Sequence, residues 1–357
     1  MQLTVIQLKP QGAFHFGNHG IGMETSVEFC PSDSLYAALL WEQIQRDHVT
    51  WEQSAPDIAP KPPFQVSSCL PYMGDVPLLP VPLLPPLPHI EQNIGERKTF
   101  KKIRFVSPSI FRALLDGGSL RDFLPSSNTR GNGLLLQGGS VLLARADEVA
   151  ANLSRIERRS DGDIRLWIHD KIPHVTVGRV NNASRYYETG EVRFAAGCGL
   201  AVLAKGNQST IDELMRQLHM LGESGLGGRR SKGLGQFTPV VLTTLELPDP
   251  TSERVVLLSR YLPSTSELQA EVLGPMASYQ LVDVGGWLYS PSAPAQRRKP
   301  VRLLSEGSVV QRLGKNPPVG AVHNVAPDYA PFPHPVWRYG LALTVGVPGE
   351  DIWRISH

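Results

Sequence analysis

The placement of proline restricts most strongly what this chain can form. Eleven of its 31 prolines lie between Pro56 and Pro88. A proline ring holds φ at about −65° and removes a backbone N–H donor, so spacing such as Pro80-Val81-Pro82 excludes a helix and a central strand. Because the leucines of this segment need burial, we expect a rigid loop wrapped over a domain. A proline-rich ligand for a partner protein is the alternative.

Size and charge set the next limits. At about 150 residues per domain, 357 residues correspond to about two domains. Charged residues make up only 19% of the chain, and the net charge is +2. Such a chain has no overall positive field, so a nucleic-acid site would have to come from local basic clusters.

The cysteines and the N-terminus indicate a cytoplasmic protein. Cys30, Cys69 and Cys198 form no Cys-x-x-Cys pair, which favours buried thiols over a disulfide framework or a zinc ribbon. The first residues lack the basic and apolar regions of a signal peptide. The longest apolar run, 76–87, is interrupted by prolines and is too short to span a membrane.

Hydrophobic periodicity predicts the main elements. A helix is expected from Ser32, its N-cap, to about Arg46. The clearest helix begins at Thr210, which forms a capping box with Glu213, and ends at Gly222. Residues 174–195 predict a hairpin with a long polar tip. Strand runs with few helices between them indicate an α+β fold.

Residues 225–237 carry the main chemical signal. They read Gly-Leu-Gly-Gly-Arg-Arg-Ser-Lys-Gly-Leu-Gly-Gln-Phe, which places five glycines and three cations in one short loop. Glycine permits positive φ and close approach of the backbone, and successive N–H groups in such turns can form an anion-binding nest. The natural ligand is a nucleic-acid backbone. A tight surface turn with incidental charge is the alternative.

Two known phosphate motifs do not fit this loop. Gly228 and Gly233 have the spacing of a P-loop, but Leu234 stands where lysine is required. A dinucleotide fingerprint needs glycine where Arg230 stands, and it needs a strand before the loop and a helix after it. Here the expected order is helix, loop, strand. A nucleoside triphosphate or dinucleotide site is therefore not expected.

The pattern Gly-x-Gly-Gly-x-x-Ser-x-Gly-x-Gly-x-Phe between a helix and a strand resembles the glycine-rich loop of the RAMP superfamily of CRISPR proteins. Further segments resemble one member, the fourth subunit of the Csm complex, which is the type III-A effector. These segments are residues 9–17, 32–38, 67–72, 79–82, 98–111, 285–287, 306–308 and 334–340. One departure is Val81, since the family pattern often has lysine at this point of its Leu-Pro-x-Pro segment.

The resemblance implies two RRM-like, ferredoxin-like RAMP domains. These would be residues 1–247, with the proline-rich insertion 56–88, a thumb-like hairpin at about 174–195 and the glycine-rich loop 225–235, and a β-rich unit at 248–357. It also implies binding of the 5′ repeat-derived handle of a CRISPR RNA. The implied protein partners are the large polymerase-nuclease subunit and a neighbouring backbone RAMP subunit, with target RNA near the thumb and no membrane.

The residues expected to contact RNA fall in three segments. In single-strand recognition phosphates fix the register, while bases meet aromatic and polar side chains. The candidates are Phe14, His15, Phe16, Gly17, Asn18, Arg179, Asn182, Gly225, Gly227, Gly228, Arg229, Arg230, Ser231, Lys232, Gly233 and Gly235. Lys98, Lys101 and Lys102 are candidates for an RNA or a protein contact. The alternatives are that Phe14 and Phe16 are core residues and that Arg179 is a solvated charge.

We expect a non-catalytic RNA-binding scaffold with no cofactor and no metal. The alternative is a metal-independent endoribonuclease that uses a histidine near the N-terminus, such as His15 or His19, as a general acid–base. Asp33 lies in the expected first turn of a helix, where a carboxylate already has a structural role. A protein-interaction module that uses the proline-rich segment is a third hypothesis.

Overall fold

The structure is a computed structural model that combines helices and sheets, in agreement with the expected α+β class. It describes residues 1–17, 24–47, 64–84, 94–124, 131–156, 162–178, 184–288, 290, 293, 295–328 and 332–348. Within these residues, no helix has the length and apolar character needed to cross a bilayer.

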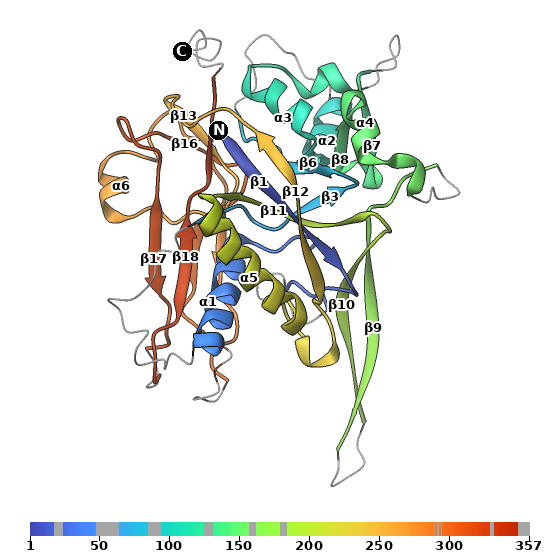
Figure 1. The fold of residues 1–357 in the computed structure, drawn as a ribbon, viewed down its shortest axis with the longest axis vertical. Helices are drawn as coiled ribbons and strands as arrows, with labels where there is room; N and C mark the ends of the chain where they lie inside the picture. Colours follow the sequence, from blue (N-terminus) through green and yellow to red (C-terminus); the bar gives the residue numbers. More distant parts are fainter. Residues whose placement is uncertain are drawn as a thin grey trace.

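An antiparallel sheet of six strands occupies the middle of the described fold (Figure 1). Its strands in spatial order are β12 (Phe237–Glu246), β1 (Gln2–Pro10), β11 (Cys198–Lys205), β3 (Leu70–Met73) and β4 (Val76–Pro77), with β2 (Gln65–Val66) also paired to β11. In the central pair, Val5 lies opposite Leu203 and Ile6 opposite Val202. Successive side chains of a strand point to opposite faces, so both faces of this sheet carry large apolar residues.

Both faces of the central sheet are covered. Helices α1 (Ser32–Asp47) and α5 (Gln208–Ser224) lie side by side (Figure 1). They share one hydrophobic cluster with Ile6 and Val202. Val5 and Leu203 belong to a second cluster, on the opposite face. Burial on both sides explains why β11 is apolar along nearly its whole length.

A smaller sheet and short helices complete the N-terminal part. The sheet has the order β5 (Leu79–Pro80), β6 (Phe105–Val106), β8 (Val141–Ala144) and β7 (Gly133–Leu136). The helices are α2 (Ile94–Lys102), α3 (Pro108–Leu115), α4 (Glu148–Ala151), η2 (Leu120–Phe123), η3 (Gln137–Gly139), η4 (Arg145–Asp147) and η5 (Leu153–Arg155). The strand that contains Pro80 lies at the edge of its sheet, as the missing N–H donor requires. The described part of the proline-rich segment is nevertheless not the expected loop. It contributes β2 to β5, and β3, which contains Pro71, lies between β11 and β4 in the central sheet.

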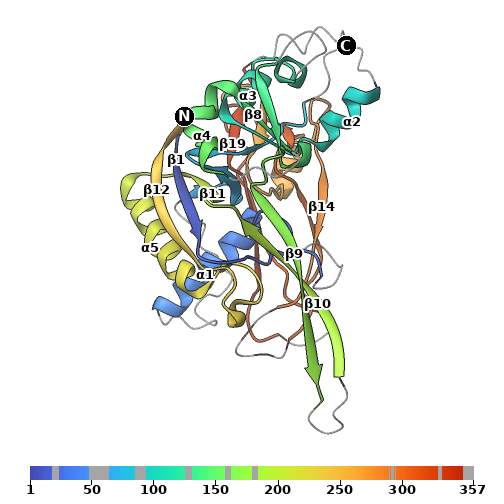
Figure 2. The same cartoon turned by 90° about the vertical axis from the view of Figure 1, so that its right-hand side faces the viewer.

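A two-stranded ribbon projects from the body in both views (Figures 1 and 2). It consists of β9 (Trp167–Val177) and β10 (Ser184–Phe194), paired antiparallel from Trp167 opposite Phe194 to Val177 opposite Ser184. The ribbon begins earlier than the expected start at residue 174. Trp167 is buried at its root, whereas Val175, Val177 and Tyr186 are exposed further along.

The C-terminal part is built from short strands. One sheet contains β13 (Arg254–Leu257), β16 (Val309–Gln311) and β19 (Thr344–Gly346). Two further sheets are the pairs β14 (Leu281–Val284) with β15 (Val301–Leu304) and β17 (Gly320–Asn324) with β18 (Trp337–Leu341). A short helix, α6 (Thr265–Gln269), follows β13. Val256, Leu258 and Leu343 belong to the same hydrophobic cluster as Val5 of the central sheet. The core therefore continues across residue 248.

The predicted helix ends need two corrections. Helix α5 starts at Gln208, and the side chain of Asn207, not that of Thr210, accepts the capping hydrogen bond, from the N–H of Thr210. Gly222 does not end the helix, which continues to Ser224. A Cβ at Gly222 would lie 2.3 Å from the carbonyl oxygen of Phe237. Glycine is needed there because α5 packs closely against β12.

A buried ion pair joins the two ends of the chain. The guanidinium of Arg338 in β18 donates to the carboxylate of Asp33 in α1 at 2.6 Å, and both side chains are 1% exposed. A second pair, Arg260 with Glu306 at 3.0 Å, lies nearby and is almost as deeply buried. Ser32, the expected N-cap, lies inside the helix, and its hydroxyl oxygen accepts from the N–H of Arg260.

Breaking the buried pair should destabilise the protein strongly. We expect Arg338→Met to lower the free energy of unfolding by about 3–5 kcal/mol, because it leaves the Asp33 carboxylate buried without its partner. The measurement is urea denaturation followed by circular dichroism. Arg302→Met is the matched control, since Arg302 pairs with Asp283 on the surface and such pairs contribute at most about 1 kcal/mol. Equal losses in the two variants would contradict this role for the Asp33–Arg338 pair.

Candidate nucleic-acid interface

A groove of about 1670 Å³ gathers residues from distant parts of the sequence. One wall is formed by His15 to Gly17 and the start of the glycine-rich loop. Other walls come from the first turns of α1, from residues 100–105, and from two C-terminal segments that include Trp287 and Trp337. The groove therefore lies where the N-terminal and C-terminal halves of the chain meet.

The groove has an excess of positive charge. Its lining includes seven cationic side chains, which are Lys101, Arg104, Arg230, Arg260, Arg297, Arg298 and Arg338. It includes three carboxylates: Asp33 and Glu306 pair with Arg338 and Arg260 of the same lining, and Asp283 pairs with Arg302. Arg104 pairs with Glu28, so the excess of positive charge comes from Lys101, Arg230, Arg297 and Arg298. A cleft lined by one sign of charge concentrates ligands of the opposite sign. The groove is thus suited to a polyanion, although the chain as a whole is nearly neutral.

The glycines of the loop adopt backbone conformations with positive φ, which are strained for residues with a Cβ atom. Gly225, Gly227, Gly233 and Gly235 all have positive φ, and Arg229 adopts the left-handed region. A Cβ at Gly235 would lie 2.3 Å from the carbonyl oxygen of Leu226, inside the loop itself. The loop between α5 and β12 is therefore tightly folded, and its middle forms one 3₁₀ turn, η6 (Arg230–Lys232).

Much of the loop backbone is already hydrogen-bonded. Six of its N–H groups donate to carbonyl oxygens of the protein, namely those of Gly225, Leu226, Gly228, Lys232, Gly233 and Gly235. The N–H of Gly228 donates to His15, and that of Gly235 to Ala13. The anion nest predicted from the glycine pattern is therefore not available at these six donors. The cationic side chains are therefore more important for ligand binding by this loop than its glycine pattern alone predicts.

The segment before the first helix divides into core and groove residues. Phe14 and Phe16 are 0% and 5% exposed, and their rings stack on each other with centroids 5.3 Å apart. They are core residues, as the alternative to base stacking predicts, although Phe16 also forms part of the groove lining. His15 and Gly17 line the groove, and Nδ1 of His15 lies 2.6 Å from the carbonyl oxygen of Gly190 in β10.

The loop also meets the ribbon, in the half that lies farther from the body. Lys232 Nζ lies 3.4 Å from Nδ1 of His174, and the His174 ring stacks on Tyr187 with centroids 5.1 Å apart. The guanidinium of Arg229 lies over the Tyr187 ring at 5.8 Å. His174 and Tyr187 are directly opposite in the register of β9 and β10. Neither residue is predicted from the sequence as part of the site. The register of the hairpin, if it had been known, would have shown that His174 and Tyr187 lie opposite each other.

Cationic neighbours change the acidity of this cluster. Partial loss of hydration lowers the pKa of His174, and the positive charges of Lys232 and Arg229 lower it further. The pKa of Tyr187 is lowered as well, because Lys232 and Arg229 outweigh its partial loss of hydration. These shifts favour the neutral form of the His174 imidazole.

The remaining candidates are dispersed. Ser231 and Gly233 are exposed on the loop. Lys98, Lys101 and Lys102 are exposed on α2, and of these only Lys101 is part of the groove lining. Asn18, Arg179 and Asn182 lie outside the described residues.

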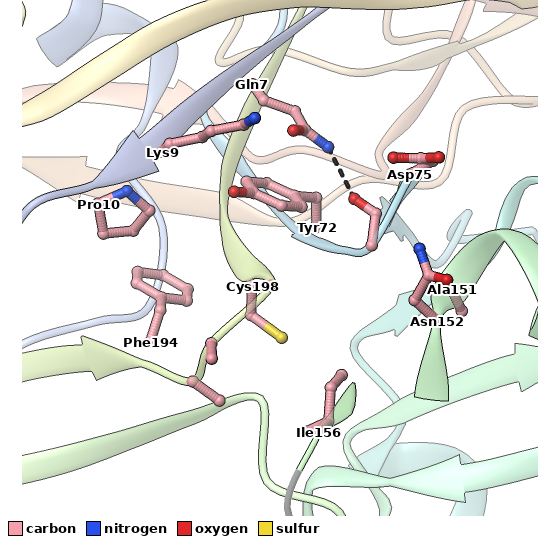
Figure 3. Close-up of a pocket in the computed structure, with 14 residues that line it drawn as sticks. Gln7, Lys9, Pro10, Tyr72, Asp75, Ala151, Asn152, Ile156, Phe194 and Cys198 are labelled. Atoms are coloured by element: carbon pink, nitrogen blue, oxygen red, sulfur yellow. Dashed lines mark hydrogen bonds between the residues drawn. The ribbon is translucent and has the colours of Figure 1, made fainter. Parts of the chain in front are cut away.

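A second pocket of about 430 Å³ lies beside β1, β3 and β11 (Figure 3). It carries one cation, Lys9, and one carboxylate, Asp75, so it has no excess charge to attract a polyanion. Burial raises the pKa of Tyr72 and that of Cys198 to about 12, so both stay protonated at neutral pH. Neither is therefore an activated nucleophile. Among the described residues, histidine, cysteine and acidic side chains form no cluster of three that could hold a metal ion.

Comparison with known proteins finds similar sequences and similar folds. The CRISPR Csm4 C-terminal domain family matches residues 250–347. The chain is 28% identical to CRISPR system Cms protein Csm4 of Mycobacterium tuberculosis (strain ATCC 25618 / H37Rv) over 344 residues, which is 94% of each protein. It is 22% identical to the protein of the same name from Methanocaldococcus jannaschii over 92% of this chain and 89% of that one.

The chain is Csm4-like. Solved structures match its fold along almost its whole length. A chain in the crystal structure of the Csm3-Csm4 subcomplex of a type III-A interference complex gives a TM-score of 0.61 at 19% identity, with 97% of this chain and 99% of that chain covered. A chain of the Csm1-Csm4 cassette in complex with cA4 gives 0.55 at 19% identity, with 97% and 98% covered. The resemblance predicted from the sequence motifs is confirmed.

Two glycines of the Csm4-like loop should respond differently to alanine. A Cβ at Gly227 would lie 2.6 Å from the His15 carbonyl oxygen, whereas a Cβ at Gly233 meets nothing within 4 Å. Both have positive φ, so each alanine costs about 1–2 kcal/mol in backbone strain. Gly227→Ala adds a steric term of about 1–3 kcal/mol. Chemical denaturation of both variants measures the difference, and equal stabilities would show that the loop does not pack on residue 15 in this way.

The acidity of His174 should depend on Lys232. We expect Lys232→Met to raise the pKa of His174 toward its ordinary value of about 6.5, because one of the positive charges that disfavour protonation is removed. Titration of the imidazole resonances by NMR measures the shift. Lys205→Met, at the end of β11, is the control and should leave the pKa of His174 unchanged. A pKa of His174 that does not move in the Lys232 variant would contradict the contact.

Proposed function

We propose that this chain is the Csm4 subunit of a type III-A CRISPR effector complex and holds the 5′ handle of the CRISPR RNA in the groove. The observation that carries this proposal is the groove itself, whose lining holds seven cations against three carboxylates beside the start of the glycine-rich loop. The Csm4-like sequence along 94% of the chain supports the choice of RNA among polyanions.

The groove offers what a single strand of RNA needs. Arg230 lines it directly, and Arg229 and Lys232 lie on the same loop beside the ribbon. Cations of this kind bind phosphates and set the register of the strand without reading its sequence. His15 adds a ring nitrogen on the groove wall, where it can contact a ribose or a base. Asn18, from the same segment, remains part of the proposal.

The projecting ribbon is the proposed thumb. Val175, Val177 and Tyr186 are 61%, 58% and 61% exposed on it, which is unusual for large apolar side chains without a partner. Contact with a guide–target duplex would cover them, and Arg179 and Asn182 would then lie near that duplex. The finer fold assignment is also a proposal, with two RRM-like units at residues 1–247 and 248–357.

The similar solved chains come from a Csm3-Csm4 subcomplex and from Csm1-Csm4 cassettes. We therefore propose that this chain likewise contacts a backbone RAMP subunit and the large polymerase-nuclease subunit, in the cytoplasm. Lys98 and Lys102 are exposed on α2 away from the groove lining and suit a protein contact. Native mass spectrometry of the co-expressed complex tests whether the chain carries RNA and whether it joins the large subunit without it.

We propose a non-catalytic role for the RNA site. An endoribonuclease is the alternative, and the position of the His15 imidazole on the groove wall favours it. Labelled repeat RNA incubated with the purified chain and EDTA separates the two functions. The scaffold role predicts intact RNA. Specific cleavage to 2′,3′-cyclic phosphate ends that is lost in His15→Ala would establish the nuclease instead.

The salt dependence of RNA binding should report on Arg230. A lysine or arginine that neutralises one phosphate contributes about one unit to the slope of log K against log salt. We expect Arg230→Ala to weaken handle binding and to lower this slope by about one. Arg216→Ala, on the exposed side of α5, is the matched control and should change neither quantity. An unchanged slope in the Arg230 variant would place the phosphates elsewhere.

A further inference from the structure

Trp287 is an exposed indole on the wall of the groove. Its side chain is 64% exposed, the largest exposure of any aromatic residue among the exposed hydrophobic residues described. It shares the groove with the start of the glycine-rich loop and with Arg297 and Arg298. Burying a tryptophan is favourable, so an indole left open on a concave surface points to a ligand.

Hydrogen bonds fix the backbone around this indole, and a cation lies over its ring. Trp287 forms a β-bridge with Arg297, flanked by hydrogen bonds from the N–H of Leu288 to Gln296 at 2.8 Å and from the N–H of Arg298 to Gly286 at 3.1 Å. The guanidinium carbon of Arg297 lies 5.3 Å from the centroid of the indole ring. A cation over one face of an indole is attracted by the negative charge of that face.

The preceding glycines fit the same construction. Gly286 has φ +116°, and a Cβ there would lie 3.1 Å from a guanidinium nitrogen of Arg298. The Nε of Arg298 donates to the carbonyl oxygen of Gly285 at 2.7 Å. Glycine at this point therefore allows the Arg298 side chain to close over the turn. The turn, the two arginines and the indole form one unit, which we name the Trp287 platform.

We propose that the Trp287 platform stacks on one unpaired nucleobase of the RNA in the groove. This inference rests on the proposed function and adds a base-binding subsite to it. Arg297 covers one face of the indole, and the base would stack on the other. Aromatic platforms beside a basic channel are the usual means of binding single-stranded nucleic acid, and they accept any base because every base has a π-face.

The charges beside Trp287 favour RNA over a protein segment as the ligand. Arg297 and Arg298 adjoin the indole. Asp283, which of the groove carboxylates is nearest to Trp287 in sequence, is already paired with Arg302. The same groove contains Arg230 of the glycine-rich loop, which we assign to a phosphate. Single-stranded RNA has what both points attract, since it carries phosphates along its whole length and a flat base at each position.

The test compares three side chains at position 287. Binding of single-stranded handle RNA to the wild type, Trp287→Phe and Trp287→Leu is measured at several salt concentrations. We expect the leucine variant to lose affinity by about tenfold, because stacking is lost, and the phenylalanine variant to retain most of it. The salt slope should stay unchanged in both, since no phosphate contact is removed. Tyr279→Leu, an exposed aromatic outside the groove lining, is the matched control.

Abasic RNA identifies the stacked base. With one base at a time removed from the RNA, one position should weaken binding to the wild type by about the same factor as Trp287→Leu. Removal of the base at that position should not change the RNA affinity of Trp287→Leu. RNA should also quench the fluorescence of the wild type more than that of Trp287→Phe. Thermal unfolding confirms that the variants are folded, as expected for a surface position.

Each outcome separates the two proposals. Absence of RNA binding to the wild type overturns the proposed function. RNA binding that is equal in the wild type and Trp287→Leu, with no position-specific abasic effect, overturns the platform and leaves the proposed function standing. Loss of a protein partner in Trp287→Leu, with RNA affinity unchanged, identifies Trp287 as a protein contact and also overturns the platform.

Discussion

The buried ion pair between Asp33 and Arg338 is the contact on which the groove depends. It joins α1 to β18 across 305 residues of sequence, at 2.6 Å, with both side chains 1% exposed. Charges removed from water are stable only while they remain paired, so this contact strongly disfavours separation of the two ends of the chain. Both residues also line the groove. The groove therefore exists only in the docked arrangement, and a break in this contact would disturb folding and ligand binding together.

In the glycine-rich loop, the same backbone N–H groups could either hold the loop in place or bind a ligand. A loop rich in glycine can expose its N–H groups to an anion or donate them to its own protein. Here Gly228 and Gly235 donate to His15 and Ala13, so the loop is fastened to the segment beside β1. The result is a rigid support that presents Arg229, Arg230 and Lys232. A preformed position for these cations lowers the entropy cost of holding a phosphate.

The sequence predicts elements well and tertiary contacts poorly, for physical reasons. The apolar stripe of α5 follows from helical periodicity, but its cap at Asn207 and the role of Gly222 depend on neighbours that periodicity does not contain. Phe14 and Phe16 illustrate the same limit, because an aromatic residue in a polar segment looks the same whether it faces a base or the core. The glycine-rich loop was found by composition. The platform at Trp287 was not, since its cationic partner Arg297 is brought beside it by a β-bridge.

The weak overall charge of the chain has a consequence for selectivity. With a net charge of +2, long-range attraction to RNA is small, so the proposed binding would rely on groups inside the groove. The proposed phosphate contact at Arg230 would respond to salt and ignore sequence, whereas stacking at Trp287 would require an unpaired base. A base-paired RNA would satisfy the first contact and fail the second. A groove that works in this way would therefore favour a single-stranded RNA end over duplex RNA and DNA, without reading a particular sequence.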